Sequence, residues 1–347
     1  MSDTFLLYGA TGYTASLITR TAVARGLRPL LAGRNPAKVK ALADPLGLEW
    51  QAFPLDDAAA LDQALRAVPL VLHCAGPYSQ TYKPMVDACL RTATHYLDIT
   101  GELIEHIALV ERDAAARAAG VMLLPSVGFD VVPSDCLALH LKRRLPTATH
   151  LKLAFQSVGG WSRGTLISAA DTADRPGMVR RDGELVRVRA AWKTLDVDFG
   201  AGPVRCVTIP WGDLATAYCS TGIPNIETYM ALPGPGRLGL KMAGLFGSPL
   251  GKRVLSKLVR LFPTGPGEAQ RAAGYSLLWG EVTDGAGRRA AARMRTPHAY
   301  SVTALAALAA VERVLAGDVH PGYQTPARAY GPDFALTIPG VTRADAF

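Results

Sequence analysis

The fold of this chain is decided by residues 5–15, which read FLLYGATGYTA. The apolar run at 5–8 favours a short buried strand, and the glycine-rich stretch after it leads into a helix predicted over 12–25. The first glycine permits a tight turn and the second lets the backbone approach a phosphate, which the N–H groups of the helix N-terminus would bind. The predicted phosphate-binding residues are Gly9, Thr11, Gly12, Tyr13 and Thr14.

The same alternation of apolar strand and amphipathic helix continues through the first third of the chain, which predicts a parallel sheet covered by helices. The further strands are expected over 29–32, 48–53, 69–74, 95–99 and 121–125, and the helices over 36–43, 57–67, 82–92 and 102–119.

After residue 150, longer alternating segments predict a mixed or antiparallel sheet, and a helix over 300–316 precedes a tail expected to be irregular. The predicted fold class is therefore α/β, an N-terminal doubly wound parallel Rossmann sheet followed by a second α+β domain with a mixed sheet. The expected domains are 1–148, 149–297 and 298–347.

Basic residues follow the second predicted strand, where the choice between the two nicotinamide cofactors is made. An acidic side chain there would bind a ribose 2′-hydroxyl, whereas this chain has Arg34, then Asn35 as a helix cap, and Lys38 one turn further. A guanidinium can stack on adenine and pair with a 2′-phosphate, so the sequence predicts NADP(H). The alternative is that both cations are ordinary solvated residues. Asp56, after the third strand, is expected beside the adenine.

Small residues follow the fourth predicted strand in the stretch HCAGPY at 73–78. The carboxyl ends of parallel strands line the ligand crevice, so we expect Cys74, Ala75 and Gly76 close to the cofactor. Tyr78 is the first bulky polar side chain beyond them, and its phenol could bind a substrate oxygen or donate a proton. Packing over the loop as a spacer is the alternative.

Carboxylates follow the next two predicted strands. Asp98 ends the fifth strand and Asp130 follows the sixth, so two acidic loops are expected to meet at the carboxyl edge and face the nicotinamide. If burial raises their pKa values, these groups could act as general acids or bases, or bind a cationic amine. The alternatives are local: Glu102 would serve only a helix dipole, and Asp130 with Asp135 would only cap a helix.

The composition limits the function classes. Of 347 residues 49% are apolar and 19% charged, and the net charge of +8 is spread along the chain, so no nucleic-acid partner is expected. The five cysteines lack metal-ligand spacing, and no metal is predicted. Without a recognisable secretory signal or a run of about 20 apolar residues, the protein is expected to be cytoplasmic.

One later segment, 238–262, pairs an apolar stripe with several basic residues. It could border a membrane surface or a carrier protein, although a core-packed helix with a solvated basic face is the favoured interpretation. The expected substrate is a small molecule or an acyl group, and the sequence leaves homodimer formation open.

Five motifs together carry a family resemblance. They are GATGYT at 9–14, AGRN at 32–35, AGPY at 75–78, YLDITGE at 96–102 and GFDVVPSD at 128–135. With them the chain resembles the saccharopine dehydrogenase-like NADP-dependent oxidoreductases, and within these the branch of trans-acting enoyl reductases. The resemblance implies an NADP-type Rossmann domain, a substrate domain after it, and a C-terminal helix that returns to the first domain. Ala15 stands where such proteins usually have glycine.

The expected reaction is NADP(H)-dependent hydride transfer to a conjugated carbon–carbon double bond on a lipid or polyketide-like substrate. A second hypothesis is reduction of an imine or ketone, as in saccharopine-type chemistry. Its candidate carboxylate-binding residues are Arg163, Arg175, Arg180 and Arg181. Two non-catalytic hypotheses are also open: a protein that binds NADP(H) without turnover, and a membrane-interaction module built on the basic segment.

Overall fold

The computed structural model describes residues 4–172, 176–231 and 264–347 of a chain that divides into two compact units. Unit 1 is Met1–Val132 with Tyr300–Phe334, and unit 2 is Pro133–Ala299 with Ala335–Phe347. The first boundary therefore lies before residue 148. The reason is that helix α7 (Val132–Arg144) packs on the second sheet, where a Cβ on Gly280 would lie 2.7 Å from Leu141 Cδ1.

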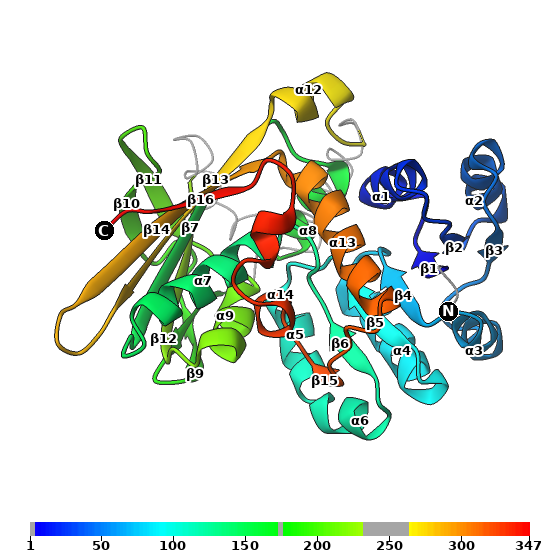
Figure 1. The fold of residues 1–347 in the computed structure, drawn as a ribbon, viewed down its shortest axis with the longest axis horizontal. Coiled ribbons are helices and arrows are strands. Elements are labelled where there is room, and N and C mark those ends of the chain that lie inside the picture. Colours follow the sequence, from blue (N-terminus) through cyan, green and yellow to red (C-terminus); the bar gives the residue numbers. More distant parts are fainter. Residues whose placement is uncertain (1–3, 173–175, 232–263) are drawn as a thin grey trace. The chain divides into compact units, whose positions relative to one another are not determined.

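Unit 1 contains a seven-stranded sheet in the order β15-β6-β5-β4-β1-β2-β3, and every neighbouring pair in it is parallel (Figure 1). The strands are β1 (Leu6–Tyr8), β2 (Leu30–Gly33), β3 (Trp50–Ala52), β4 (Leu70–His73), β5 (His95–Asp98), β6 (Met122–Leu124) and β15 (Gly322–Tyr323). The central strands β1 and β4 are buried throughout and apolar except at His73, as expected for a sheet covered on both faces. The predicted doubly wound parallel sheet is confirmed.

The helices of unit 1 connect these strands. They are α1 (Tyr13–Ala24), α2 (Pro36–Ala43), α3 (Ala58–Arg66), α4 (Tyr78–Thr92), α5 (Leu103–Val110), α6 (Asp113–Ala118), α13 (Ala299–Leu315) and α14 (Pro326–Tyr330), with a 3-10 turn at Asp44–Leu46. A second 3-10 turn, Phe334–Thr337, begins with the last residue of unit 1 and continues in unit 2. The prediction of a single helix over 102–119 was wrong, because this segment forms the two helices α5 and α6. Asp113 starts the second helix and accepts a hydrogen bond from the Tyr323 N–H at 2.8 Å, which ties α6 to β15.

The seventh strand of this sheet comes from the tail, so the prediction of an irregular tail was wrong for this part. The Gly322 N–H donates to the Val121 carbonyl at 2.9 Å, and the Gln324 N–H donates to the Leu123 carbonyl at 2.8 Å. Gly322 has φ +97, and a Cβ there would lie 2.5 Å from Asp113 Oδ1, so only glycine fits. A two-residue strand is too short to show an alternating pattern in the sequence.

Unit 2 is built on a nine-stranded mixed sheet, which confirms the second half of the predicted fold class. The main path is β10-β11-β12-β7-β13-β14-β16, and β8 and β9 branch from β12. The strands are β7 (His150–Val158), β8 (Gly177–Arg181), β9 (Glu184–Val188), β10 (Thr194–Asp198), β11 (Pro203–Thr208), β12 (Asn225–Ala231), β13 (Tyr275–Thr283), β14 (Arg289–Pro297) and β16 (Thr342–Asp345). Strand β12 is parallel to β7, and the other pairs are antiparallel.

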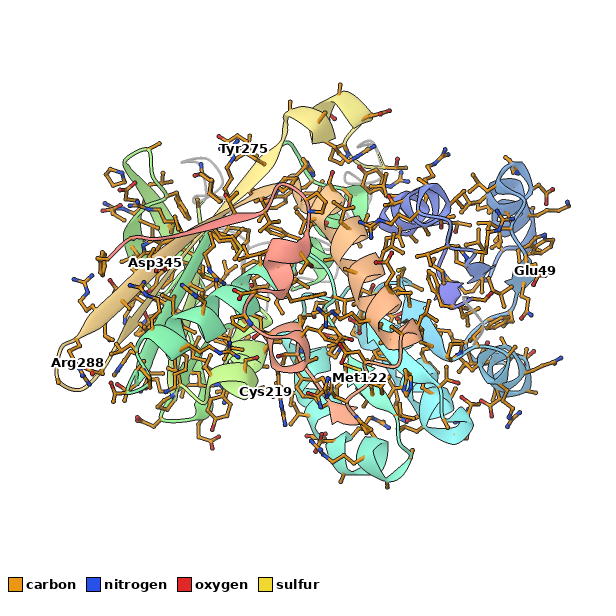
Figure 2. The ribbon with its side chains drawn as sticks, viewed as in Figure 1. Glu49, Met122, Cys219, Tyr275, Arg288 and Asp345 are labelled. Atoms are coloured by element: carbon orange, nitrogen blue, oxygen red, sulfur yellow. The ribbon has the colours of Figure 1, made fainter. Side chains whose placement is uncertain are left out.

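The three longest described strands of this sheet are β7, β13 and β14, each of nine residues, and the β13–β14 hairpin runs beside β7 (Figure 1). Figure 2 labels Tyr275 at the start of β13 and Arg288 at the turn, at opposite ends of the hairpin. Besides α7, the helices described for this unit are α8 (Arg163–Thr172), α9 (Asp213–Thr221) and α12 (Glu268–Ala273). The C-terminal strand β16 pairs with β14, and therefore the last residues of the chain belong to unit 2.

Two further sequence expectations concern membranes. Across the described ranges, no helix combines the length and the apolar character that crossing a bilayer requires. The basic segment at 238–262, for which a core-packed helix was the favoured interpretation and a membrane or carrier-protein border the alternative, lies wholly within 232–263, outside the described residues.

Candidate functional site

The glycine loop after β1 lies directly against the loop after β4. Gly9 has φ +83, and a Cβ there would lie 2.7 Å from the Ala75 nitrogen and 2.8 Å from the Ala75 Cβ. The Gly9 and Ala10 N–H groups both donate to the Ala32 carbonyl at the end of β2, at 2.8 and 3.1 Å. The strand order reverses between β1 and β4, because β2 and β3 are added on one side of β1 and β4 to β6 on the other, and open α/β sheets bind their ligands at such a point.

The N-terminus of α1 faces this loop with no side-chain cap. Gly12 is the N-cap in an extended conformation, and the first turn of α1 contains no acidic residue. Thr11 and Gly12 are exposed, whereas Tyr13 and Thr14 are half-buried. A Cβ on Gly12 would lie 3.3 Å from the Gly9 carbonyl oxygen, so the turn is tight. This is a glycine cradle at a helix N-terminus, and it fits the pyrophosphate of a dinucleotide.

Two exposed cations follow β2. Arg34 comes directly after the strand and Lys38 lies in the first turn of α2. Asn35 caps that helix, since its Oδ1 accepts the Lys38 N–H at 3.0 Å. The side chain of Asn35 therefore has a structural partner, while both cations are in solvent and available to a 2′-phosphate.

The ends of β1, β2 and β3 bring opposite charges near one buried phenol. Tyr8 donates a hydrogen bond to the Phe53 carbonyl at 3.0 Å. Burial raises the pKa of Tyr8 to about 12; the charge of Arg34 acts against this rise and that of Asp56 adds to it. Exposed Asp56 and Arg34 are thus grouped at this edge, where the sequence analysis expected the adenosine end of the cofactor.

Tyr78 begins α4 immediately after the small residues that end β4. Its hydroxyl donates to the His73 carbonyl at 3.3 Å, and its ring stands edge-on to the His73 ring at 5.6 Å. Burial raises the pKa of Tyr78 well above its usual value, and Cys74 and Asp98 raise it further. The half-buried phenol therefore keeps its proton at neutral pH and acts as a hydrogen-bond donor.

His73 was not predicted as a site residue. The hydroxyl of Thr81 donates to the Ala75 carbonyl at 2.6 Å, so the His73 Nε2–H donates to Thr81 Oγ1 at 3.1 Å, and Nδ1 is unprotonated. Among the described residues, His73 Nδ1 has no hydrogen-bond partner. Burial lowers the pKa of His73 to about 3, so this ring is neutral.

Asp98 is fully buried, and its carboxyl group is directed at the protein. Oδ2 accepts the Tyr96 hydroxyl at 2.6 Å, and Oδ1 accepts the N–H groups of Thr100 at 2.9 Å and Ser126 at 2.8 Å. Burial raises the pKa of Asp98 to about 6, although the three hydrogen bonds oppose that rise. Through the two N–H groups bound by Oδ1, the Asp98 carboxyl group links the loop after β5 to the loop after β6.

Asp130 lies on the second of these loops and is half-buried. A Cβ on Gly101 would lie 2.8 Å from both the Cβ and the Oδ2 of Asp130. The structure thus places the two acidic loops in contact, with Asp98 inside the protein and Asp130 nearer its surface.

A buried chain of hydrogen bonds supports both loops and was missed by the sequence analysis. The Ser126 hydroxyl donates to the Thr100 carbonyl at 2.5 Å, so the His106 Nε2–H must donate to Ser126 Oγ at 2.8 Å. His106 Nδ1 then accepts the Tyr323 hydroxyl at 2.9 Å. Burial lowers the pKa of His106 to about 3. No spacing in the sequence links these residues, because they come from α5, the loop after β6 and β15.

By its fold and its glycine loop, unit 1 falls in the class of Rossmann domains that bind a dinucleotide. Residues 5–124 match the family model described as the saccharopine dehydrogenase NADP binding domain. This part of the chain is such a domain, its cofactor is NADP(H), and the family resemblance drawn from the motifs is confirmed.

Several mycobacterial relatives carry the name trans-acting enoyl reductase. The protein of Mycobacterium ulcerans is 36% identical over 149 residues, which are 40% of this chain and 35% of that protein. The protein of Mycobacterium leprae is 37% identical over 150 residues, again 40% and 35% of the two chains. The matched part of this chain therefore spans about a third of the length of these relatives.

Among solved structures, saccharopine dehydrogenase (L-Glu forming) from Saccharomyces cerevisiae matches over 100% of both chains, with a TM-score of 0.67. Because the sequence identity is only 16%, this match shows a shared fold and nothing about the reaction.

Proposed function

We propose that this protein is an NADPH-dependent reductase that acts on a conjugated carbon–carbon double bond of an acyl substrate, lipid-like or polyketide-like. The observation that carries the proposal is the meeting of the Gly9 and Ala75 loops at the switch point of the sheet, with Arg34 exposed beside it. The enoyl reductase name of the mycobacterial relatives supports the choice of this reaction over reduction of an imine or a ketone.

The cofactor would be held by three groups of residues. The loop 9–14 and the first turn of α1 would bind the pyrophosphate through backbone N–H groups. Arg34 and Lys38 would bind the 2′-phosphate, with Asp56 beside the adenosine. Cys74, Ala75 and Gly76 would leave room for the ribose and nicotinamide, and Asn35 would act by fixing the start of α2.

On the substrate side, we assign hydrogen bonding of the carbonyl oxygen to Tyr78. Bound NADPH supplies the hydride, and negative charge then develops on the conjugated carbonyl oxygen. The Tyr78 hydroxyl retains its proton, and its hydrogen bond to the His73 carbonyl is long, at 3.3 Å, so it can be exchanged for a substrate oxygen. Asp130 is the candidate for proton transfer. Asp98 is proposed as a positioning residue, because its oxygens already accept three hydrogen bonds.

The cofactor assignment is tested by R34A, with NADPH and NADH titrated by fluorescence. Loss of a charge-assisted contact should weaken NADPH binding by about 10- to 100-fold while NADH binding changes less than threefold. The matched control is R20A, an exposed arginine of α1, which should leave both affinities within about twofold. Equal losses for the two nucleotides in R34A would contradict the assignment.

The reaction is tested by following NADPH oxidation with an enoyl thioester, a cyclic imine and a keto acid. Turnover of the enoyl thioester, lowered at least tenfold in Y78F, is the expected result. Turnover of the imine or keto acid alone would replace the proposal by reduction of that substrate class. Tight NADPH binding without any turnover would favour a non-catalytic role.

A further inference from the structure

The first turn of helix α13 touches two loops of unit 1 that are far apart in the sequence. Tyr300 and Thr303 are three residues apart and so lie on one face of the helix. Tyr300 meets the glycine loop, and Thr303 meets the loop after β6 that carries Asp130. These loops hold the proposed cofactor-binding and substrate-side residues.

The contact with the glycine loop is an aromatic pair. The rings of Tyr13 and Tyr300 stand perpendicular to each other, with their centroids 5.2 Å apart. Tyr13 follows the N-cap Gly12 and is the first residue of α1. Such a pair fixes the orientation of both rings, so Tyr300 limits the movement of the turn whose N–H groups would bind pyrophosphate.

The contact with the second loop combines a hydrogen bond with close packing. Thr303 is buried, and its Oγ1 accepts the Phe129 N–H at 3.0 Å. A Cβ on Gly128 would lie 2.9 Å from Thr303 Cγ2, so the loop backbone rests on this side chain. Asp130 is the next residue after Phe129, and its side chain packs against Gly101 of the neighbouring loop.

We propose that Tyr300 and Thr303 are positioning residues, through which one turn of α13 sets the cofactor loop and the Asp130 loop relative to each other. The inference rests on the proposed function and extends it to residues that act through the two loops they contact. Hydride transfer depends steeply on the placement of the reacting groups, so loosening either contact should lower activity. The two contacts should act on different kinetic parameters.

The Tyr300 contact is tested by NADPH titration of Y300A and Y300F. Removal of the ring should raise the Kd and KM for NADPH about two- to tenfold, and Y300F should restore both to within twofold of the starting protein. E312A is the control on the same helix, because Glu312 contacts Arg25 at the far end of α1 and should leave both constants unchanged. Equal NADPH affinity in Y300A and the starting protein would refute this half of the proposal.

The Thr303 contact is tested by T303V, which keeps the shape of the side chain and removes the acceptor of the Phe129 N–H. We expect kcat to fall about tenfold while the NADPH Kd stays within twofold. G128A should also lower kcat, because its new methyl group would meet Thr303 Cγ2. The double variant G128A/T303S, which lacks that Cγ2, should recover part of the lost kcat. No change in kcat, or no restoration, would refute this half.

Amide hydrogen exchange separates the inference from the proposed function. Exchange should become faster at 9–15 in Y300A and at 126–131 in T303V, whether or not a substrate has been found. Failure of the starting protein to bind NADPH or to turn over would overturn the proposed function alone. Unchanged exchange in both variants would overturn the positioning role even in an active reductase.

Discussion

Replacing His106 by glutamine should remove a source of acid sensitivity from unit 1. His106 is fully buried between Tyr323 and Ser126, and its folded-state pKa is about 3, compared with 6.5 for an unperturbed histidine. Protonation would place a hydrogen on Nδ1, which already accepts the Tyr323 hydroxyl. The unfolded chain therefore binds a proton at mildly acidic pH that the folded chain does not bind.

The sign of the effect follows from this difference in proton binding. Because the folded pKa is depressed, the contribution of His106 to stability is present above pH 6.5 and is lost as the pH falls from 6.5 toward 3. Between pH 7.5 and pH 5.0 the two pKa values correspond to a loss of about 2 kcal/mol. The buried His73 adds a loss of the same sign, which is common to the wild type and the variant.

The assay is urea unfolding followed by far-UV circular dichroism, with wild type and H106Q compared at pH 7.5 and pH 5.0. H106Q is expected to be less stable at pH 7.5, because the hydrogen-bond chain is interrupted, and its disadvantage should shrink by about 2 kcal/mol at pH 5.0. H150Q, which replaces an exposed histidine, should show no such change. The same disadvantage of H106Q at both pH values would refute the reasoning.

Two further predictions concern the loops at the sheet edge. Between pH 4.5 and pH 7.5, D98N should gain about 2 kcal/mol of unfolding free energy relative to wild type in the same urea assay. The reason is that the pKa of Asp98 is raised to about 6 in the folded protein, so wild type loses stability as the pH rises from about 4 to 6. A stability difference between D98N and wild type that stays constant with pH would contradict this prediction. G9A should abolish NADPH binding, because the new Cβ would collide with the loop after β4. The control G26A should bind NADPH normally, because Gly26 has the same φ of +83 but nothing within 4 Å of a Cβ. A similar loss of NADPH binding in both variants would mean that backbone strain, rather than the collision, causes the loss.

The sequence predicts the first unit well where local physics is sufficient. Strands β1 and β4 are short apolar runs buried on both faces, and α2 starts where Asn35 and Pro36 predict a cap and a first turn. Helix α13 begins within a residue of its predicted start. In each case the deciding residues are neighbours in the chain, so their pattern is visible in one sequence.

The same approach fails where distant segments complete an element. Strand β15 has two residues and exists because Val121 and Leu123 offer backbone partners about 200 positions earlier. Strand β14 reads RAAARMRTP, and its alanines and arginines give it little strand propensity, but it pairs along its whole length with β13. Pairing across the sheet, rather than local preference, determines both.

The site shows why residue type and strand position do not by themselves identify a chemical role. Asp98 and Asp130 are both acidic residues after parallel strands, and the sequence treats them alike. The structure separates them by burial, since Asp98 is fully buried and Asp130 is half-buried. Three hydrogen-bond donors reach Asp98, and two of these are backbone N–H groups of the loops after β5 and β6. A carboxylate with that many internal partners can leave them only at the cost of buried unpaired donors. The proposed chemistry is therefore assigned to Tyr78, whose hydroxyl has a long bond to exchange, and to the more accessible Asp130.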